Sequence, residues 1–289
     1  MNIISFNANG LRSRLHQLEA IIEKYAPDII GIQETKVADD QFPVEAINAL
    51  GYDVIYHGQK SHYGVALLYR LPLVNSIKGF SQDTEDSQKR LVFGQFQAGE
   101  KKLNIFNGYF PQGESRDHPQ KYPCKQAFYK DLLDHLEQHH QPDELILVMG
   151  DMNIAPLDID IGIGDDNKKR WLRTGKCCFL PEEREWLSHL ENWGLVDSYQ
   201  HFLSQSEEPQ SGDSQREESQ SSQSDTDRYS WFDYRSRGFE REPKRGLRID
   251  LMLTSSPLLE LTQSSGVDQE IRAMEKPSDH CPIWLTLDL

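Results

Sequence analysis

Eight short apolar or alternating segments recur along this chain of 289 residues, and they constrain its fold more than any other feature. Segments of this length, rich in Ile, Val, Leu and Phe and bounded by polar residues, are typical of β-strands. We therefore expect strands at residues 2–7, 29–33, 65–69, 91–96, 103–109, 145–149, 249–253 and 283–287.

Helical spacing of apolar residues appears between some of these segments. Some expected strands follow one another directly and others are followed by a helix, so a mixed sheet is favoured over a purely parallel one. Two packed sheets with outer helices use all the elements, and we expect one α/β domain over residues 1–289. The helical positions are Leu15, Leu18, Ile21 and Ile22, then Phe128, Leu132, Leu133 and Leu136, then Trp186, Leu190 and Trp193.

The composition limits the possible partners and the compartment. With 31 Lys and Arg against 46 Asp and Glu, the formal net charge is −15, which argues against coating nucleic acid or membranes through the overall field. Any contact with DNA must be local. The four cysteines show no C-x-x-C or zinc spacing, and no leader or membrane span is evident. We expect a cytoplasmic monomer that does not bind membranes.

Residues 203–227 differ from the rest of the chain. They are almost entirely Ser, Gln, Glu and Asp, with seven acidic residues against one arginine. A segment with so few apolar side chains cannot form a core, so we expect a disordered surface loop. A partner-binding or self-shielding acidic loop is the functional alternative.

Polar side chains stand at the ends of the expected strands. Reactive groups in α/β proteins are commonly placed at strand ends on one side of a sheet, where a carboxylate is close to the core yet open to a cleft. The sequence therefore predicts a site assembled from distant segments. Its candidate residues are Asn7, Glu34, Tyr109, Asp151, Asn153, Asp250, Asp279 and His280.

Four carboxylates gathered at one site would repel one another unless a cation compensates. Oxygen donors from Glu, Asp and Asn without cysteine suit Mg²⁺, with Mn²⁺ as a substitute, better than a closed zinc site. Each motif also has a purely structural interpretation, because Gly, Asp and Asn are common in turns and Tyr109 suits a sheet edge. Asp250 is harder to explain in that way, because an acid inside an apolar strand requires a partner, and His280 is a candidate.

At these positions the chain resembles the exonuclease III family of DNA repair nucleases, within the endonuclease, exonuclease and phosphatase superfamily. The similar segments occur in the family's order along the chain. The Ser- and Gln-rich segment near 203–227 is the one large departure, and it resembles an insertion. The segments are SFNANGLRSR, IIGIQETKV, YHGQKSHYGVALL, NGYFPQGESRDHP, GDMNIAP, IGIGDDNKKRWLRTGK, SWFDYRS, GLRIDLML and MEKPSDHCP.

The resemblance implies a four-layer α/β/β/α sandwich and Mg²⁺-dependent hydrolysis of phosphodiesters in duplex DNA. It implies cleavage from 3′ ends, cleavage 5′ to abasic sites and removal of 3′ blocking groups. It also implies roles for individual residues. The implied metal ligands are Asn7, Glu34, Asp151, Asn153, Asp279 and His280. For catalysis, the resemblance implies that Asp151 activates the attacking water and that Asn153 orients it. Asp250 would hold His280, and His280 and Tyr109 would contact the phosphate.

Local basic clusters with interleaved aromatic residues offer a way for an acidic chain to bind DNA. A solvated charged face is the structural alternative for each cluster. Aromatic residues of the SWFDYRS segment would pack against an extruded abasic sugar, which has no base to unstack. The residues expected to contact DNA are Arg90, Gln112, Arg116, Lys169, Arg170, Arg173, Trp231 and Phe232.

Two other functions are compatible with the same fold. A superfamily phosphatase acting on lipid or inositol substrates would share the metal site but would have no use for the basic aromatic segments. A nucleic-acid-binding regulator that had lost catalysis would not need the complete set of acids and His280.

Overall fold

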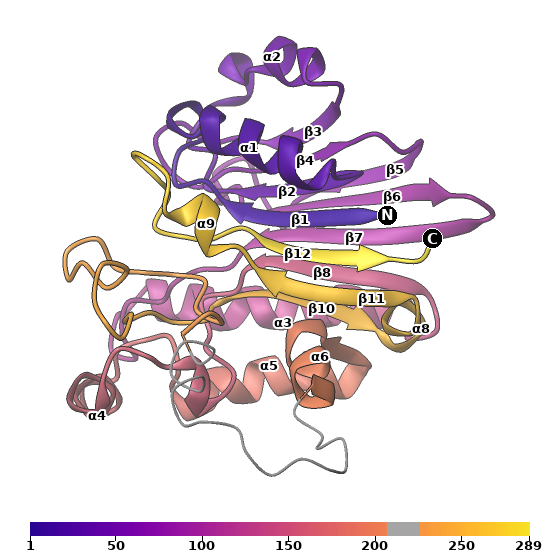
Figure 1. Cartoon of the computed structure of the whole chain (residues 1–289). Coiled ribbons are helices and arrows are strands. Elements are labelled where there is room, and N and C mark those ends of the chain that lie inside the picture. The colour runs from indigo at the N-terminus through magenta and orange to yellow at the C-terminus, as the bar shows by residue number, and fades with distance from the viewer. Residues whose placement is uncertain (207–225) are drawn as a thin grey trace, which may run out of the picture.

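The computed structural model describes residues 1–206 and 226–289. Two six-stranded sheets pack face to face, and helices cover the outer surface of each sheet (Figure 1). The predicted four-layer α/β/β/α sandwich is therefore confirmed.

The first sheet has the strand order β11-β12-β1-β2-β4-β3. Within it β1 and β2 are parallel, and every other neighbouring pair is antiparallel. The strands are β1 (Asn2–Asn7), β2 (Ile29–Gln33), β3 (Asp53–His57), β4 (Val65–Tyr69), β11 (Thr262–Val267) and β12 (Ile283–Leu287).

The second sheet repeats this arrangement, with the order β5-β6-β7-β8-β10-β9 and one parallel pair, β7 with β8. Both sheets are thus mixed, as expected. The strands are β5 (Leu73–Lys78), β6 (Leu91–Ala98), β7 (Lys101–Tyr109), β8 (Leu145–Asp151), β9 (Leu195–Asp197) and β10 (Asp250–Ser255).

The three expected helices are present, and the structure adds shorter or more polar ones. Helix α4 has only two apolar residues, Trp171 and Leu172, so it lacks the repeated apolar positions by which a helix is predicted. The helices are α1 (Leu15–Tyr25), α2 (Val44–Ala49), α3 (Lys121–His139), α4 (Asp165–Thr174), α5 (Pro181–Trp193), α6 (Ser198–Ser206), α8 (Ser256–Glu260) and α9 (Gln269–Arg272).

Three apolar layers hold these elements together. Ile29, Leu67 and Ile105 belong to the core between the sheets. Leu132 of α3 packs on the outside of the second sheet, and Leu18 of α1 packs on the outside of the first. All five side chains are fully buried, and each contributes about 1.5–3 kcal/mol by leaving water.

A polar bridge joins the two sheets beneath the ends of their parallel strands. Gln33 of β2 donates from Nε2 to Asn107 Oδ1 of β7 at 2.6 Å. Asn107 Nδ2 in turn donates to the backbone oxygens of Ile32 and Ala66 in the first sheet at 3.1 and 2.8 Å. Hydrogen bonds buried between apolar layers have strict geometry, so this bridge fixes how the two sheets align.

The acidic segment expected to be disordered at 203–227 lies mostly outside the described residues. Its two borders are ordered, which corrects the expected limits: residues 203–206 complete helix α6, and residues 226–228 form a turn. In the described part of the chain, no helix combines the length and apolar character needed to cross a bilayer.

Candidate active site

The parallel strand pair of each sheet ends at the same edge of the sandwich. In the first sheet Asn7 is in register with Gln33, so Glu34 follows directly beside it. In the second sheet Tyr109 is in register with Asp151. Because β10 runs antiparallel to β8, its first residue, Asp250, pairs with Asp151. Strand direction and register therefore bring these side chains together from both sheets.

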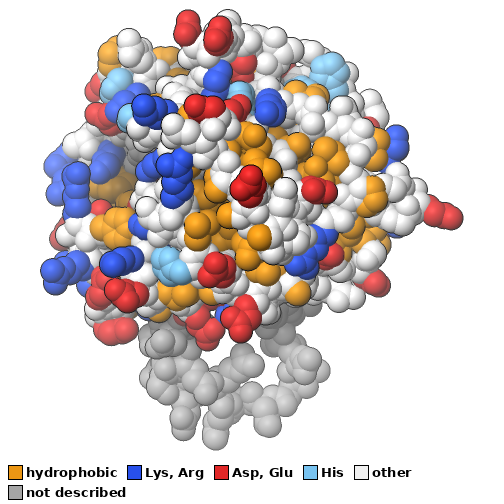
Figure 2. All heavy atoms as spheres, turned by 90° about the horizontal axis from the view of Figure 1, so that it is seen from above, with side chains coloured by type: hydrophobic (Ala, Val, Ile, Leu, Met, Phe, Trp, Pro, Cys, Tyr) orange, Lys and Arg blue, Asp and Glu red, His pale blue; other side chains and the backbone are white. Residues whose placement is uncertain are grey.

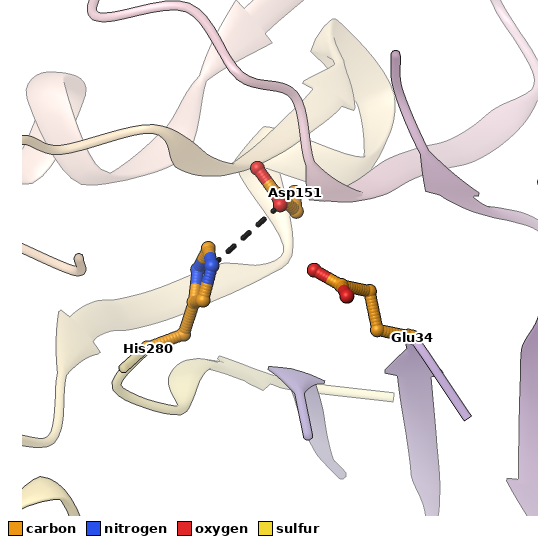
Figure 3. A group of neighbouring side chains, drawn as sticks. All are labelled: Glu34, Asp151 and His280. Atoms are coloured by element: carbon orange, nitrogen blue, oxygen red, sulfur yellow. Dashed lines mark ion pairs between the residues drawn. The ribbon is translucent and has the colours of Figure 1, made fainter. Parts of the chain in front are cut away.

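His280 reaches the same place from the loop before β12. Ser278 donates from Oγ to the backbone oxygen of Asn7 at 2.7 Å, and His280 N donates to Ser278 Oγ at 3.2 Å, which fixes the loop against the end of β1. Figure 3 shows Glu34, Asp151 and His280 pointing toward one another. Each offers a ligand atom, and these atoms lie within 4.8 Å of one another.

Asn7 links the acids of the two sheets. Its Nδ2 donates to Glu34 Oε1 at 3.0 Å and to Asp151 Oδ2 at 2.9 Å, while its Oδ1 accepts from Asn9 N at 2.9 Å. Asn7 is fully buried. It therefore holds two carboxylates close together in fixed orientations.

His280 lies between two aspartates. Its Nδ1 is 2.9 Å from Asp250 Oδ2, and its Nε2 is 3.7 Å from Asp151 Oδ2. Asp250 is held in turn by Ser230, whose Oγ donates to Asp250 Oδ2 at 2.6 Å and accepts from Asp250 N at 3.0 Å. The predicted partnership of Asp250 with His280 is thus present in the structure.

This arrangement alters the protonation of both groups. Burial lowers the pKa of His280, but the carboxylates of Asp250 and Asp151 outweigh burial and raise it to about 10. Burial raises the pKa of Asp151 above its usual range, and neighbouring Asp250 and Glu34 add to that effect against the opposing charge of His280. The site thus contains a charged imidazolium beside a carboxylate of raised proton affinity.

Glu34 and Tyr109 complete the acidic side of the site. Although burial raises the pKa of Glu34, the ammonium of Lys36 at 2.9 Å and the amide of Asn7 bring it below the usual value. Burial raises the pKa of Tyr109 well above its usual value, and the charges of Glu34 and Asp151 raise it further. Tyr109 is therefore a protonated phenol, able to donate a hydrogen bond.

Asn153 follows the end of β8 in a turn that is closed by the Asp151 side chain. Its φ is 53°, in the left-handed region where an Asn is tolerated better than most residues. Its N donates to Asp151 Oδ1 at 3.1 Å and its Nδ2 donates to the backbone oxygen of Phe110 at 3.0 Å. Gly150, near the end of β8, has φ 143°, and a Cβ there would lie 1.9 Å from the Gly108 oxygen. Backbone geometry therefore requires glycine at 150 and favours asparagine at 153.

Asp279 lines the same cleft but stands outside the group of Glu34, Asp151 and His280. Its Oδ1 accepts from Asn9 Nδ2 at 2.7 Å, and its Oδ2 accepts from Trp231 Nε1 at 3.1 Å. With both oxygens engaged, Asp279 fixes the Trp231 side chain at the rim of the cleft.

The donor set fits a hard divalent cation. Glu34 and Asp151 supply carboxylate oxygens on opposite sides of a small gap, and Asn7 supports both. The Lys36 ammonium already pairs with Glu34, which shows that this carboxylate attracts positive charge. His280 also offers a ring nitrogen to this gap, and because Nδ1 lies 2.9 Å from Asp250 Oδ2, Nε2 is the atom that faces the two acids.

A cleft of about 600 Å³ opens directly onto these groups. Its far wall is basic and aromatic, formed by helix α4 and by the loop after Trp231. Figure 2 shows Lys and Arg side chains gathered on the left, the side on which the strand ends of the site lie in Figure 1. The basic and aromatic lining residues are Arg170, Trp171, Lys176, Trp231, Arg235, Arg241 and Arg245.

Three of the residues expected to contact DNA, Gln112, Arg170 and Trp231, line this cleft. Lys169 and Arg173 are exposed on α4 but outside the cleft lining. Arg116 is also outside it, with its Nη2 paired to Glu182 Oε2 at 2.9 Å.

Phe232 and Arg90 were also expected to contact DNA, but both are buried. Phe232 is fully buried among Tyr229, Phe239 and Cys281, because neighbouring side chains of an extended segment point to opposite sides and Trp231 takes the cleft side. It cannot pack against an extruded sugar.

Arg90 is only 7% exposed, which corrects its expected role as a phosphate contact. Its guanidinium lies 4.1 Å from the ring centre of Tyr63 and 4.6 Å from that of Tyr109. Its Nη1 also donates to the backbone oxygen of Tyr109 at 2.9 Å. Arg90 therefore holds Tyr109 in place from behind the cleft.

Ser230, Lys36 and Asn9 contact site residues and were not predicted individually. All three lie inside the family-like segments SWFDYRS, IIGIQETKV and SFNANGLRSR, so position within a motif was the available signal. Their roles depend on contacts between segments distant in sequence, such as Asn9 with Asp279, which motif spacing does not reveal.

Known proteins resemble this chain over most of its length. Residues 4–280 match the model of the endonuclease/exonuclease/phosphatase family. The chain is 53% identical to exodeoxyribonuclease III of Haemophilus influenzae, over 98% of each chain. An AP endonuclease structure from Archaeoglobus fulgidus aligns over 100% of both chains with 29% identity and a TM-score of 0.83. The 3′ phosphatase NExo from Neisseria, bound to a product DNA hairpin, aligns equally fully with 30% identity and a TM-score of 0.82.

The family match extends over nearly the whole chain, and the two carboxylates, the imidazolium and the cleft lie inside the matched region. The expected resemblance is thereby confirmed: this chain belongs to the endonuclease/exonuclease/phosphatase family, in the group that contains exodeoxyribonuclease III.

Proposed function

We propose that this chain is a DNA repair nuclease that hydrolyses phosphodiesters in duplex DNA. It acts as a 3′-to-5′ exonuclease, as an endonuclease cutting 5′ to abasic sites, and on 3′ blocking groups. The observation that carries this proposal is the placement of His280 Nε2 3.7 Å from Asp151 Oδ2 in a cleft with a basic, aromatic wall.

Mg²⁺, with Mn²⁺ as a substitute, is the cofactor we propose, held by Glu34 and Asp151 with Asn7 supporting both. When bound, the ion supplies positive charge that neutralises the phosphate oxygens and polarises their bonds to phosphorus. The oxygen donors of the site support this choice over zinc.

Asp151 accepts the proton of the attacking water. Asn7 Nδ2 at 2.9 Å and His280 Nε2 at 3.7 Å hold the Asp151 carboxylate in place for this transfer. Asn153 stands two residues later, bound to Asp151 Oδ1 through its backbone N, and its side chain orients the water from the same turn. The new bond forms between the water oxygen and phosphorus, and the bond from phosphorus to the 3′ oxygen breaks. The departing oxygen takes up a proton from solvent and becomes a 3′ hydroxyl.

His280 and Tyr109 stabilise the charge that grows on the phosphate. Both are hydrogen-bond donors at neutral pH, because their pKa values are raised. Donors fixed in advance in a site partly closed to water stabilise the transition state more than the ground state. Asp250 and Arg90 contribute by holding these two donors in place.

The substrate we propose is double-stranded DNA with an abasic site or a free 3′ end. The basic wall provides phosphate contacts despite the net charge of −15. Both Trp231 and Phe232 were expected to pack against an abasic sugar. We propose that Trp231 alone does so, held by its hydrogen bond to Asp279. We further propose that the protein acts as a monomer in the cytoplasm.

Incubation with a duplex carrying one abasic site tests the function. We expect nicking 5′ to the site with Mg²⁺ and none with EDTA. DNA binding without nicking would support the non-catalytic regulator instead. Phosphate release from an inositol phosphate, without DNA cleavage, would support the superfamily phosphatase.

A further inference from the structure

A buried lysine lies directly behind the turn that carries Asp151 and Asn153. Lys125 of α3 has a fully buried side chain, and its Nζ lies 2.6 Å from Oε1 of the equally buried Glu183 of α5. The same Nζ donates to the backbone oxygen of Asn153 at 2.8 Å. The ammonium thus serves the site as well as the contact between the two helices, which lie side by side in Figure 1.

A tyrosine one helical turn away supports the same turn. Tyr129 donates from its hydroxyl to the backbone oxygen of Met152 at 2.7 Å. Residues four apart on a helix share one face, so Lys125 and Tyr129 reach consecutive carbonyls of the segment that leads to Asn153.

Lys125 has little freedom to point elsewhere. A Cβ on Gly113 would lie 3.0 Å from Lys125 Cδ, so the loop packs closely on the lysine stem. Glu183 Oε2 accepts from Leu180 N at 2.8 Å, which fixes the carboxylate at the start of α5. Burial lowers the pKa of Lys125, but the charge and hydrogen bond of Glu183, together with the neighbouring Cys178 and Cys177, outweigh burial and raise it, so the amine stays protonated.

The segment it holds is strained and chemically important. Asn153 adopts a left-handed conformation with φ 53°, and its N donates to Asp151 Oδ1 at 3.1 Å. Such a conformation persists only where surrounding contacts enforce it. A buried ion pair is a weak source of stability, which leaves positioning as the role these contacts support best.

We propose that Lys125 is a positioning residue for catalysis, which holds the Asp151–Asn153 turn in its reactive geometry through the Asn153 carbonyl. This rests on the proposed nuclease function. A contribution to folding alone predicts that activity follows stability, whereas positioning predicts that the two separate.

Two variants distinguish these roles. Glu183→Gln removes the carboxylate that keeps Lys125 protonated but retains the amine, which can donate to the Asn153 oxygen with or without its charge. Loss of one partner of a buried ion pair strongly destabilises proteins. Lys125→Met combined with Glu183→Gln removes both charges and keeps an amide oxygen for Leu180 N. We therefore expect the double variant to have the higher melting temperature of the two. Lys130→Met is the control, a lysine of the same helix with a side chain 69% exposed.

If Lys125 positions the turn, the double variant should have the lower kcat of the two on abasic-site DNA, although it has the higher melting temperature. The kcat is measured at a temperature where all variants are folded. The double variant should lose about 10- to 100-fold in kcat with KM unchanged, whereas Glu183→Gln and the control stay near wild type. A double variant with wild-type kcat, or a larger loss in Glu183→Gln, would overturn the proposal.

Hydrogen exchange provides a readout that does not require activity. The amides of residues 152–154 should exchange at least about tenfold faster in the double variant than in the wild type, because the carbonyl contact that restrains the turn is gone. Unchanged exchange would also overturn the proposal. If the wild type does not cleave DNA, the nuclease function fails, and exchange alone decides whether Lys125 restrains the turn.

Discussion

Asp250 Oδ2 lies 2.9 Å from Nδ1 of His280, on the opposite side of the ring from Asp151. The first contact orients the imidazole and keeps it charged, and the second places that charge beside the proposed base. Each aspartate therefore has a separate consequence for activity.

Asp250→Asn should lower kcat by about 10²- to 10⁴-fold, the usual contribution of a positioned acid or base. Burial already lowers the pKa of His280, and the variant removes the Asp250 charge that opposes burial. The basic limb of the pH–rate profile should therefore move to lower pH. Profiles measured for this variant and for the exposed control Asp143→Asn test the prediction, and superimposable profiles would contradict it.

Asp151→Asn should reduce cleavage by about 10³-fold or more, because an amide cannot accept the water proton. It should also raise the melting temperature of the metal-free protein at pH 8, since it removes a buried carboxyl whose ionised form is disfavoured. DNA binding should remain measurable. Exposed Asp53→Asn is the control, and cleavage at the wild-type rate would rule out Asp151 as the base.

The metal-free protein should become less stable as the pH rises from 6 to 9. Asp151 and His280 both have folded-state pKa values above their ordinary values, so the folded state binds more protons than the unfolded state in this range. Stability from such groups is present at low pH and is lost as the pH passes the folded pKa. We expect the melting temperature to fall by about 5 °C.

Mg²⁺ should counter that loss, because a divalent cation takes the place of the proton on Asp151. Scanning calorimetry with Mg²⁺ and with EDTA should show a larger stabilisation at pH 8 than at pH 6. An equal effect at both values would mean that the ion binds away from this carboxylate.

Replacing Arg241 should change DNA binding, whereas replacing Arg90 should change the rate of cleavage. Arg241 is exposed in the cleft wall, so Arg241→Gln should weaken binding and reduce the slope of log K against log salt by about one. Buried Arg90 stacks on Tyr109, so Arg90→Met should lower kcat and leave the salt slope unchanged. Filter binding across salt concentrations separates them, and a smaller slope for Arg90→Met would restore it as a phosphate contact.

The sequence predicted the elements whose own side chains form a core. Strands β1, β2, β4 and β8 were located because their apolar residues are continuous or alternate. Edge strand β5, whose residues are mostly exposed, and charged helix α4 were missed, because neither carries that signal. Strand-end placement also predicted the convergence of Glu34, Asp151 and His280, since strand direction determines which ends meet.

The direction in which single side chains point was harder to predict. Phe232 and Arg90 lie in family-like or expected segments, yet both face inward. Their orientation depends on which neighbour occupies the cleft and on the two tyrosines that flank Arg90, and these contacts form only in the folded chain.

The geometry of the site depends on the hydrogen bond between Gln33 and Asn107, which joins the two sheets. Asn7 and Glu34 belong to one sheet, whereas Tyr109 and Asp151 belong to the other, so each sheet contributes half of the site. A slip of one sheet over the other by a fraction of an ångström would separate the halves of the site while leaving each sheet intact. We therefore expect the cleavage rate to report how the two sheets are aligned. A packing defect that shifts one sheet would lower this rate even where the melting temperature is unchanged.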